Sequence, residues 1–276
     1  MSRGRGQSIN FRPYKALFRI RFTNSLQYRS AAIAGLVTQF GWGLMYVLGF
    51  SALYSSNPDA FPMTFQQTVS YIWMQQAFIA LFFIWFYDNS IFEAIESGHI
   101  AYEMVRPMDL YSRWFTQTTA NRLSRAVLRC FPILFVGFML PEPFRLMFPD
   151  PVRLGLFLIS VLLSMGVVVC FSMLIYISAF STINSLGTRI IVGVAGDFLA
   201  GGYIPIPFFP DTLRRLVELS PFGAMQNMPL LIYSGHLTGD GLVRGMLLQV
   251  FWLVTLLVIG RVWMKRALGK VIVQGG

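Results

Sequence analysis

Long apolar runs separated by short polar segments dominate the chain. Six of these runs come close to the roughly 20 residues that a helix needs to cross a bilayer. The fifth, from Arg189 to Tyr203, would measure only about 22 Å at 1.5 Å per residue and is short for a span. The pattern predicts an all-α membrane protein with a single transmembrane domain, whose spans cover residues 31–54, 66–88, 120–140, 154–180, 189–205 and 244–263.

A basic segment, residues 1–30, precedes the first span. Within it, apolar side chains recur at helical spacing on one side, and Arg12, Lys15 and Arg19 fall on another. This arrangement predicts an amphipathic helix that lies on the inner leaflet, with its basic residues toward anionic headgroups. The alternative is a flexible basic tail. The apolar stripe consists of Tyr14, Leu17, Phe18, Phe22 and Leu26.

The polar segment between the second and third spans, residues 91–107, is longer than a simple turn needs. It reads IFEAIESGHIAYEMVRP, with a helical run up to Gly98 and a second short one that ends before Pro107. We interpret it as a rigid cytoplasmic elbow that receives force from another protein. The alternative is a solvated connecting loop.

The stretch between the fifth and sixth spans contains helices too short to cross. Pro205, Pro207 and Pro210 end the fifth span, and Ser220-Pro221 has the signature of a new helix start. That helix would run to about Tyr233, with Pro229 interrupting it. An apolar segment of about 10–14 residues is typical of a re-entrant helix, so residues 211–235 predict a helical hairpin that dips into the outer face of the membrane. A seventh span is the alternative, and the charge distribution opposes it.

Composition and charge support this interpretation and fix an orientation. Hydrophobic residues make up 55% of the chain and charged residues 12%, about half the share in soluble domains. The net charge of +10 would suggest nucleic acid in a soluble protein, but here the basic residues flank apolar runs. With both termini and the elbow placed inside, 17 of the 22 Lys and Arg residues lie on the cytoplasmic side. Six spans satisfy this arrangement, and five or seven do not.

Catalytic chemistry is not apparent in the sequence. There is no Walker A pattern, no G-x-S-x-G and no H-E-x-x-H. His99 and His236 fall on opposite sides of the membrane in the predicted topology, so we expect no catalytic residues and no metal site. Asp197 is the one acid deep in a predicted span. Such an acid is a functional candidate, although a structural hydrogen bond near the Gly-rich break is an equal alternative.

Aromatic, amide and thioether side chains are mixed in the first two spans. Amide groups in a span must face protein or water, so these residues suggest a pathway for an amphiphile. The alternative is ordinary helix packing with amide hydrogen bonds between helices. With Asp197, the candidate pathway residues are Gln39, Trp42, Met45, Trp73, Gln75 and Gln76.

Two segments resemble the ABC-2 type permeases, the membrane subunits of ATP-driven exporters, and most closely the daunorubicin-resistance-like group of six-span permeases from small export operons. IESGHIAYEMVRPMDLYSRW (Ile95 to Trp114) is similar to the coupling-helix pattern of that group, and ELSPFGAMQNMPLLIYSG (Glu218 to Gly235) to its re-entrant segment. The order of these features along nearly the whole chain carries the resemblance. Together with the proline pattern described above, it gives the predicted re-entrant residues Pro205, Pro207, Pro221, Phe222 and Pro229.

The resemblance implies how such a chain works. It would be a permease in the bacterial cytoplasmic membrane, paired with an identical or a related second permease chain and with two cytoplasmic ATPase subunits that bind ATP and Mg. It would export a hydrophobic or amphiphilic compound. Ile91, Phe92 and Ile95 would fill a groove of the ATPase, and Glu93 and Glu96 would pair with its basic rim. The remaining implied coupling residues are Gly98, His99, Met104, Arg106 and Pro107.

A secondary carrier is the competing hypothesis from the sequence. It would use Asp197 as its ion or proton site and would need no ATPase partner.

Overall fold

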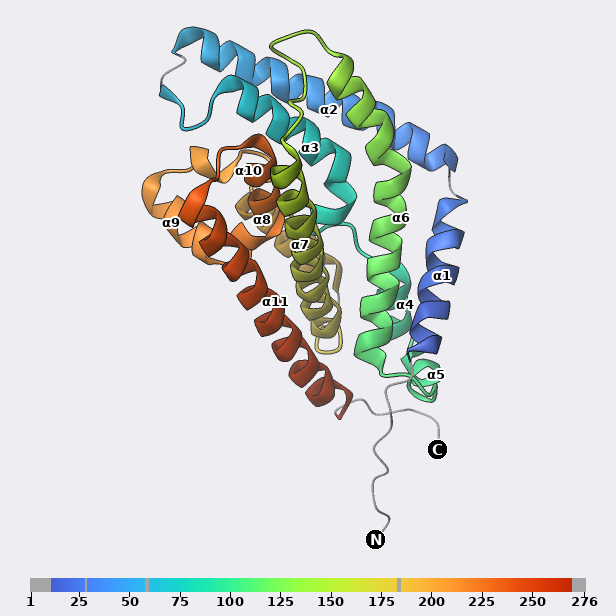
Figure 1. The fold of residues 1–276 in the computed structure, drawn as a ribbon. Coiled ribbons are helices and arrows are strands. Elements are labelled where there is room, and N and C mark those ends of the chain that lie inside the picture. The colour runs from blue at the N-terminus through green and yellow to red at the C-terminus, as the bar shows by residue number, and fades with distance from the viewer. Residues whose placement is uncertain (1–10, 28, 58–59, 183–184, 270–276) are drawn as a thin grey trace.

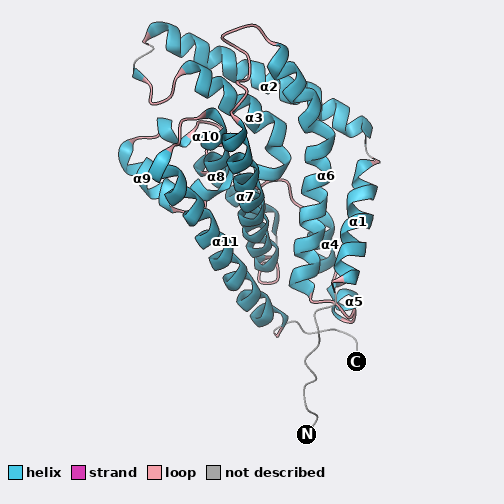
Figure 2. Ribbon diagram, viewed as in Figure 1, coloured by secondary structure: helices cyan, strands magenta, loops and turns pink. Residues whose placement is uncertain are grey.

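A computed structural model describes residues 11–27, 29–57, 60–182 and 185–269, and in these residues the chain forms helices and loops without a β-strand (Figure 2). The predicted N-terminal tail up to residue 10 lies outside the described residues. The all-α prediction is confirmed. The helices are α1 Arg12–Leu26, α2 Arg29–Ser56, α3 Phe65–Phe82, α4 Asn89–Glu96, α5 Ile100–Met104, α6 Leu110–Met139, α7 Pro151–Ser178, α8 Ser185–Leu199, the 3₁₀-helix η2 Ile206–Phe208, α9 Asp211–Leu219, the π-helix η3 Gly223–Asn227, α10 Met228–Ser234 and α11 Gly239–Leu268.

Helix α7 is the central column of the bundle. It packs against α11 on one side and against α10, α6 and α3 on others. Helix α6 in turn packs along both α1 and α3 (Figure 1). The helices α4 and α5, the start of α1 and the end of α11 lie at one end of the molecule, and the α6–α7 connection lies at the other (Figure 1). This arrangement is the one that the predicted orientation requires.

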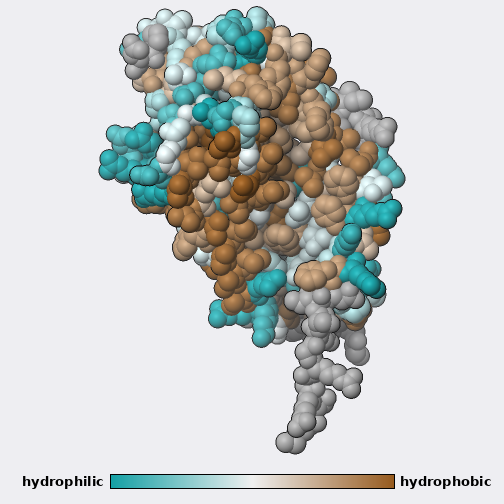
Figure 3. Space-filling model, viewed as in Figure 1, coloured by the Kyte–Doolittle hydropathy of each residue, from teal (hydrophilic) through white to brown (hydrophobic). Residues whose placement is uncertain are grey.

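The surface between these two ends is apolar. Figure 3 shows hydrophobic residues over α11 and the middle of the molecule, with hydrophilic residues gathered toward its ends. On α11, Leu247, Phe251 and Val258 are all more than half exposed. An apolar surface of this extent suits lipid rather than water. Within the described residues, three helices are long and apolar enough to cross a membrane: α2 from Ala34, α7 and α11.

The other three predicted spans correspond to helices of different character. Helix α3 has 18 residues and includes four glutamines, α8 has 15 residues, and α6 carries several arginines. Length and composition therefore do not mark them as spans, and the six-span topology stays a prediction.

Helix bounds differ from the predicted spans because caps and polar turns extend the helices beyond the apolar windows. The third span was expected at 120–140, but α6 begins at Leu110, where the Asp109 carboxylate accepts a 2.8 Å hydrogen bond from Ser112 N. The sixth was expected at 244–263, and α11 extends beyond it at both ends. Conversely, the fifth was expected at 189–205, but α8 ends at Leu199 and Gly201 follows with a φ of +82°.

The largest correction concerns the second span, expected as one helix over 66–88. Helix α3 ends at Phe82, and the chain then runs extended through Phe83 with ψ at 133°. An extended segment inside a helical bundle leaves backbone N–H and C=O groups without helical partners, and such groups are costly away from water.

Two buried charged side chains supply those partners. Arg122, 1% exposed, donates to the Phe83 carbonyl at 2.8 Å and to the Ile84 carbonyl at 3.4 Å. Asp197, also 1% exposed, accepts a 2.6 Å hydrogen bond from Ile84 N. The arginine comes from α6 and the aspartate from α8, so side chains of two separate helices stabilise the unwound backbone. Further acceptors of the Arg122 guanidinium are Ala80 O, Leu81 O and Ser172 Oγ.

We predict that Arg122→Met destabilises the protein by about 3–5 kcal/mol, because it leaves several carbonyls unpaired and the Asp197 carboxylate without a countercharge. The measurement is the thermal unfolding of the purified chain in detergent. Arg19→Ala on the exposed face of α1 is the control and should change the midpoint little. Equal midpoints for the two variants would show that the break does not depend on Arg122.

Candidate functional site

The predicted elbow consists of two short helices that meet at Gly98. Helix α4 ends at Glu96, Gly98 takes a φ of +74°, and α5 begins at Ile100. Only glycine adopts this left-handed conformation readily, so Gly98 sets the angle between the two helices. The segment is thus a pair of helices with buried contacts and not a solvated loop.

Asp88 fastens the start of the elbow to the bundle. Its carboxylate accepts hydrogen bonds from Asn121 Nδ2 at 2.6 Å and Gln117 Nε2 at 2.8 Å, both on α6. It also caps α4 by accepting from Ser90 N at 3.1 Å. The Asp88 backbone N–H donates to the Tyr176 hydroxyl of α7 at 2.8 Å. The residue that ends the broken second span therefore ties α4 to two long helices.

The apolar face of α4 points into the molecule. Ile91 and Phe92 are 2% and 1% exposed. The centroids of the Phe92 and Tyr176 rings lie 4.9 Å apart. Arg189 Cζ lies 4.1 Å from the centroid of the Phe92 ring. The expectation that Ile91 and Phe92 fill a groove of another protein is corrected, because the chain's own α7 and α8 cover them. Ile95 is partly buried beside them.

Glu103 clamps α5 to α6. Its two carboxylate oxygens accept from Arg113 Nη2 and from Trp114 Nε1, each at 2.9 Å. Arg113 and Trp114 are both buried. An ion pair that is shielded from water and shares a second hydrogen bond holds its partners in one geometry. Displacement of α5 is therefore passed to the first turn of α6.

The exposed face of the elbow combines acids with large apolar residues. Tyr102 is 72% exposed, Val105 81% and Met104 39%. Sequence reasoning missed Tyr102 and Val105. The signal was present, as both are large apolar residues in a polar stretch just before Arg106-Pro107. Six further residues that the resemblance implied are exposed here as well, namely Glu93, Glu96, Gly98, His99, Arg106 and Pro107. Of these, Glu96 also accepts a 2.6 Å hydrogen bond from Ser185 Oγ of α8.

A cavity of about 380 Å³ lies where α2, α3, α6 and the extended stretch after α3 meet. It contains three of the predicted pathway residues, Gln39, Trp42 and Gln76. Arg129 of α6 also lines it, together with the aromatic residues Tyr46, Phe83, Trp85, Phe86 and Tyr203. Sequence reasoning placed Arg129 among the orienting charges and did not connect it with the pathway. We call this space the α2–α6 cavity.

The other predicted pathway residues have different surroundings. Trp73 is buried and donates to the Phe144 carbonyl at 3.1 Å, and Gln75 donates to the Gly202 carbonyl at 2.6 Å. Both are packing contacts. Met45 is 52% exposed on α2 and does not line the cavity. Asp197 accepts a hydrogen bond from the unwound backbone in the second span. The structure therefore divides the predicted set into three cavity residues, three residues with packing or hydrogen-bond contacts inside the bundle, and the exposed Met45.

The predicted re-entrant segment consists of short helices, of which α9 is largely exposed and residues 223–234 are buried. A helix was expected from Pro221 to about Tyr233, but α10 begins at Met228, after the π-helix η3. Pro229 lies in the first turn of α10, where the missing N–H costs nothing, so it opens this helix and does not interrupt it. The Ala224 carbonyl of η3 accepts from Gln249 Nε2 and Ser164 Oγ, each at 3.1 Å. Of the remaining predicted residues, Pro205 and Pro207 are buried at η2, and Phe222 is half-buried before η3.

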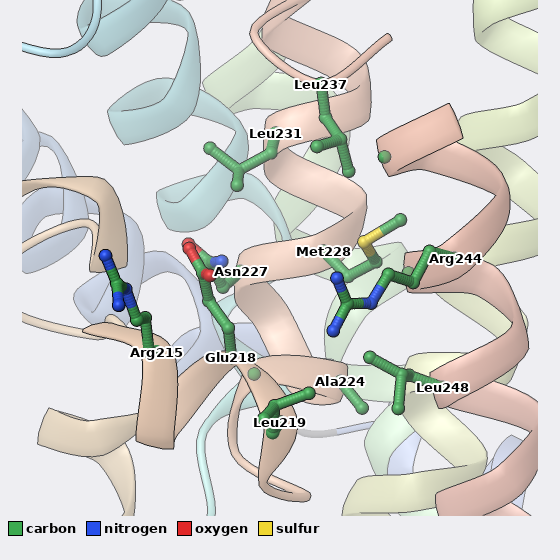
Figure 4. A pocket seen from close by; sticks show the side chains of 13 residues that line it. Arg215, Glu218, Leu219, Ala224, Asn227, Met228, Leu231, Leu237, Arg244 and Leu248 are labelled. Carbon is green, nitrogen blue, oxygen red and sulfur yellow. The ribbon is translucent and has the colours of Figure 1, made fainter. Parts of the chain in front are cut away.

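A second cavity of about 460 Å³ opens between α9, η3, α10 and α11 (Figure 4). Glu218 lies in it between Arg215 and Arg244 (Figure 4). Partial burial raises the pKa of the Glu218 carboxyl, and the positive charges of Arg214 and Arg244 oppose that rise. This cavity has charges of both signs, in contrast to the α2–α6 cavity.

Comparison with known proteins decides the family. A family model described as "ABC-2 family transporter protein" matches residues 40–275. The chain belongs to the ABC-2 transporter family. The resemblance to the ABC-2 permeases is thereby confirmed, and this ABC-2 protein is a multi-pass membrane component of a transporter. No curated protein and no solved structure matched the chain.

We predict that Glu103→Ala loosens α5 in this ABC-2 protein, because Arg113 would be left buried without its partner. Amide hydrogen exchange over residues 100–106 should speed up by roughly tenfold or more. Glu93→Ala, which removes an exposed carboxylate of α4, is the matched control and should leave exchange in α5 unchanged. Equal exchange in both variants would contradict the clamp.

Proposed function

We propose that this chain is the transmembrane subunit of an ABC exporter in the bacterial cytoplasmic membrane. It moves a hydrophobic or amphiphilic compound outward. ATP and Mg bind to two separate cytoplasmic ATPase subunits, and a second permease chain completes the complex. The polypeptide spans the membrane six times, with both termini and the elbow inside.

The elbow is the observation that carries this proposal. It is fixed to the bundle at two points, by Asp88 to α6 and α7 and by Glu103 to α6. Its outer face nevertheless presents Tyr102 and Val105 to solvent. Exposed aromatic and apolar residues on a rigid support are typical of an interface anchor for another protein.

Helix α6 connects the elbow with the α2–α6 cavity. Its first turns hold Glu103 through Arg113 and Trp114, its middle binds the broken second span through Arg122, and Arg129 lines the cavity. A push on α5 by closing ATPase subunits would therefore tilt one continuous helix and reshape the cavity. ATP binding and hydrolysis would in this way open the cavity to the two sides of the membrane in turn.

The ion-coupled carrier receives no comparable support. It requires Asp197 as an ion site, whereas one oxygen of that carboxylate accepts from Ile84 N and the Arg122 guanidinium holds the neighbouring carbonyls. The hydrogen bond to Ile84 N favours a structural role for Asp197 Oδ1, and we propose no second function on this acid.

The test uses the permease reconstituted with its ATPase subunits, in which substrate-stimulated ATP hydrolysis is measured. Val105→Asp and Tyr102→Ala should each lower the stimulated rate by about tenfold, the effect expected when an interface anchor is removed. The unfolding midpoint of the permease should stay unchanged, because both side chains are exposed.

Leu216→Asp on α9 is the matched control, since Leu216 is 66% exposed at a site remote from the elbow. It should leave the stimulated rate unchanged. Full stimulation in both elbow variants would remove the elbow from the coupling mechanism.

A further inference from the structure

The α2–α6 cavity contains an arginine that the protein itself does not neutralise. Arg129 forms no ion pair and no hydrogen bond within the described part of the chain, and its Nε is buried without a partner. A cation that is partly withdrawn from water is costly unless a counter-charge or hydrogen-bond acceptor offsets it.

Two amides beside this arginine also have unused hydrogen-bonding capacity. Gln39 donates through Nε2 to the Gln76 carbonyl at 3.4 Å, which leaves its Oε1 as a buried acceptor without a partner. Gln76 Oε1 is likewise buried and unpaired. Both residues line the cavity and are at most 6% exposed. Buried polar atoms are normally paired, so three unpaired groups around one cavity point to a polar ligand.

The close approach of α2 and α6 supports this arrangement. A Cβ atom at Gly35 would lie 2.7 Å from Arg129 Cζ, so the glycine leaves room for the guanidinium beside α2. The arginine therefore lies against α2 at the cavity wall.

The remaining wall of the cavity is aromatic. Trp42 and Trp85 are about half exposed at its rim, and the Trp85 and Phe86 rings stack at 4.2 Å. Among the described lining residues Arg129 is the one formal charge, and no acid is present. A positive polar end and an aromatic apolar wall together fit a molecule with an anionic head and an apolar body.

We propose that the α2–α6 cavity binds an anionic amphiphile, as a phosphate monoester is. The acidic head pairs with Arg129, a hydroxyl of the same head donates to the unpaired oxygens Gln39 Oε1 and Gln76 Oε1, and the apolar part lies along Trp42 and Phe86. The binding site itself does not depend on the proposed function. The identification of the bound molecule as the exported cargo rests on that function. An anionic membrane lipid has the same chemistry and is the other source of such a ligand.

The experiment measures equilibrium binding of labelled dodecyl phosphate to the full-length permease in phosphatidylcholine nanodiscs, with empty nanodiscs as background. Dodecyltrimethylammonium is the matched cation. The wild-type chain should bind the phosphate at least about tenfold more tightly, as a charge-assisted contact predicts. Similar affinities for the two would overturn the proposal, and this comparison needs no variant.

Arg129→Gln removes the charge and should weaken dodecyl phosphate binding by roughly tenfold or more, with little effect on the cation. Lys265→Gln is the control for loss of a positive charge, because Lys265 is exposed in the last turn of α11 and does not line the cavity. Its binding should stay within about twofold of wild type. Unchanged binding in Arg129→Gln would overturn the proposal.

Two further arms separate the sources of the ligand. Stimulation of ATP hydrolysis by dodecyl phosphate in the complete transporter would identify the site with the cargo. Competition by phosphatidylglycerol, without any stimulation, would identify it with a membrane lipid. Either result supports an anionic site. Binding is measured without ATPase subunits, so the two proposals can fail separately. If the elbow variants keep full ATP hydrolysis, the proposed function is wrong, but the anion site is unaffected.

Discussion

The fold depends on the hydrogen bonds that two buried side chains, Arg122 and Asp197, make to the unwound backbone after α3. After Phe82 the second predicted span becomes extended, and the freed carbonyls and amides cannot turn to water. Arg122 donates to the carbonyls, and Asp197 accepts from an amide. Because the two side chains have opposite charges, their burial is cheaper together than separately, although neither forms a direct ion pair with the other among the described residues.

The break also determines where the elbow lies. It brings Asp88 against α6, where Gln117 and Asn121 bind it, and so the start of α4 is fixed by the same helix that supplies Arg122. A continuous helix through residue 88 would have carried the chain straight out of the bundle. The unwound stretch instead lets α4 fold its apolar face back onto Tyr176. The internal packing of the elbow and the extended part of the span are thus one structural unit.

Helix α6 connects this unit with the α2–α6 cavity. Over 30 residues it contacts the elbow, the break and the α2–α6 cavity in turn. At 1.5 Å per residue it is about 45 Å long. The helix contains Pro132, which follows all three of these contacts in the sequence. The elbow contacts, the break and Arg129 therefore lie on one helical stretch, and a displacement of its first turn would be passed toward the most polar part of the cavity.

The sequence by itself determined the class of the molecule. Its apolar runs, low charge and flanking arginines are local properties of the chain, and they suffice to indicate a helical membrane protein, an elbow and short outer helices. They also sufficed for the family, because the segments around Gly98 and Pro221 keep their order along the chain. Tertiary structure alone decided which faces turn inward. Ile91 and Phe92 have the same helical spacing whether they meet another protein or their own α7, and only the position of Tyr176 settles that they are buried. Likewise, Arg129 is one arginine among several in a basic stretch until α2 and α3 bring Gln39 and Gln76 beside it. Periodicity describes one element at a time, whereas a cavity or an anchored elbow arises where several elements meet.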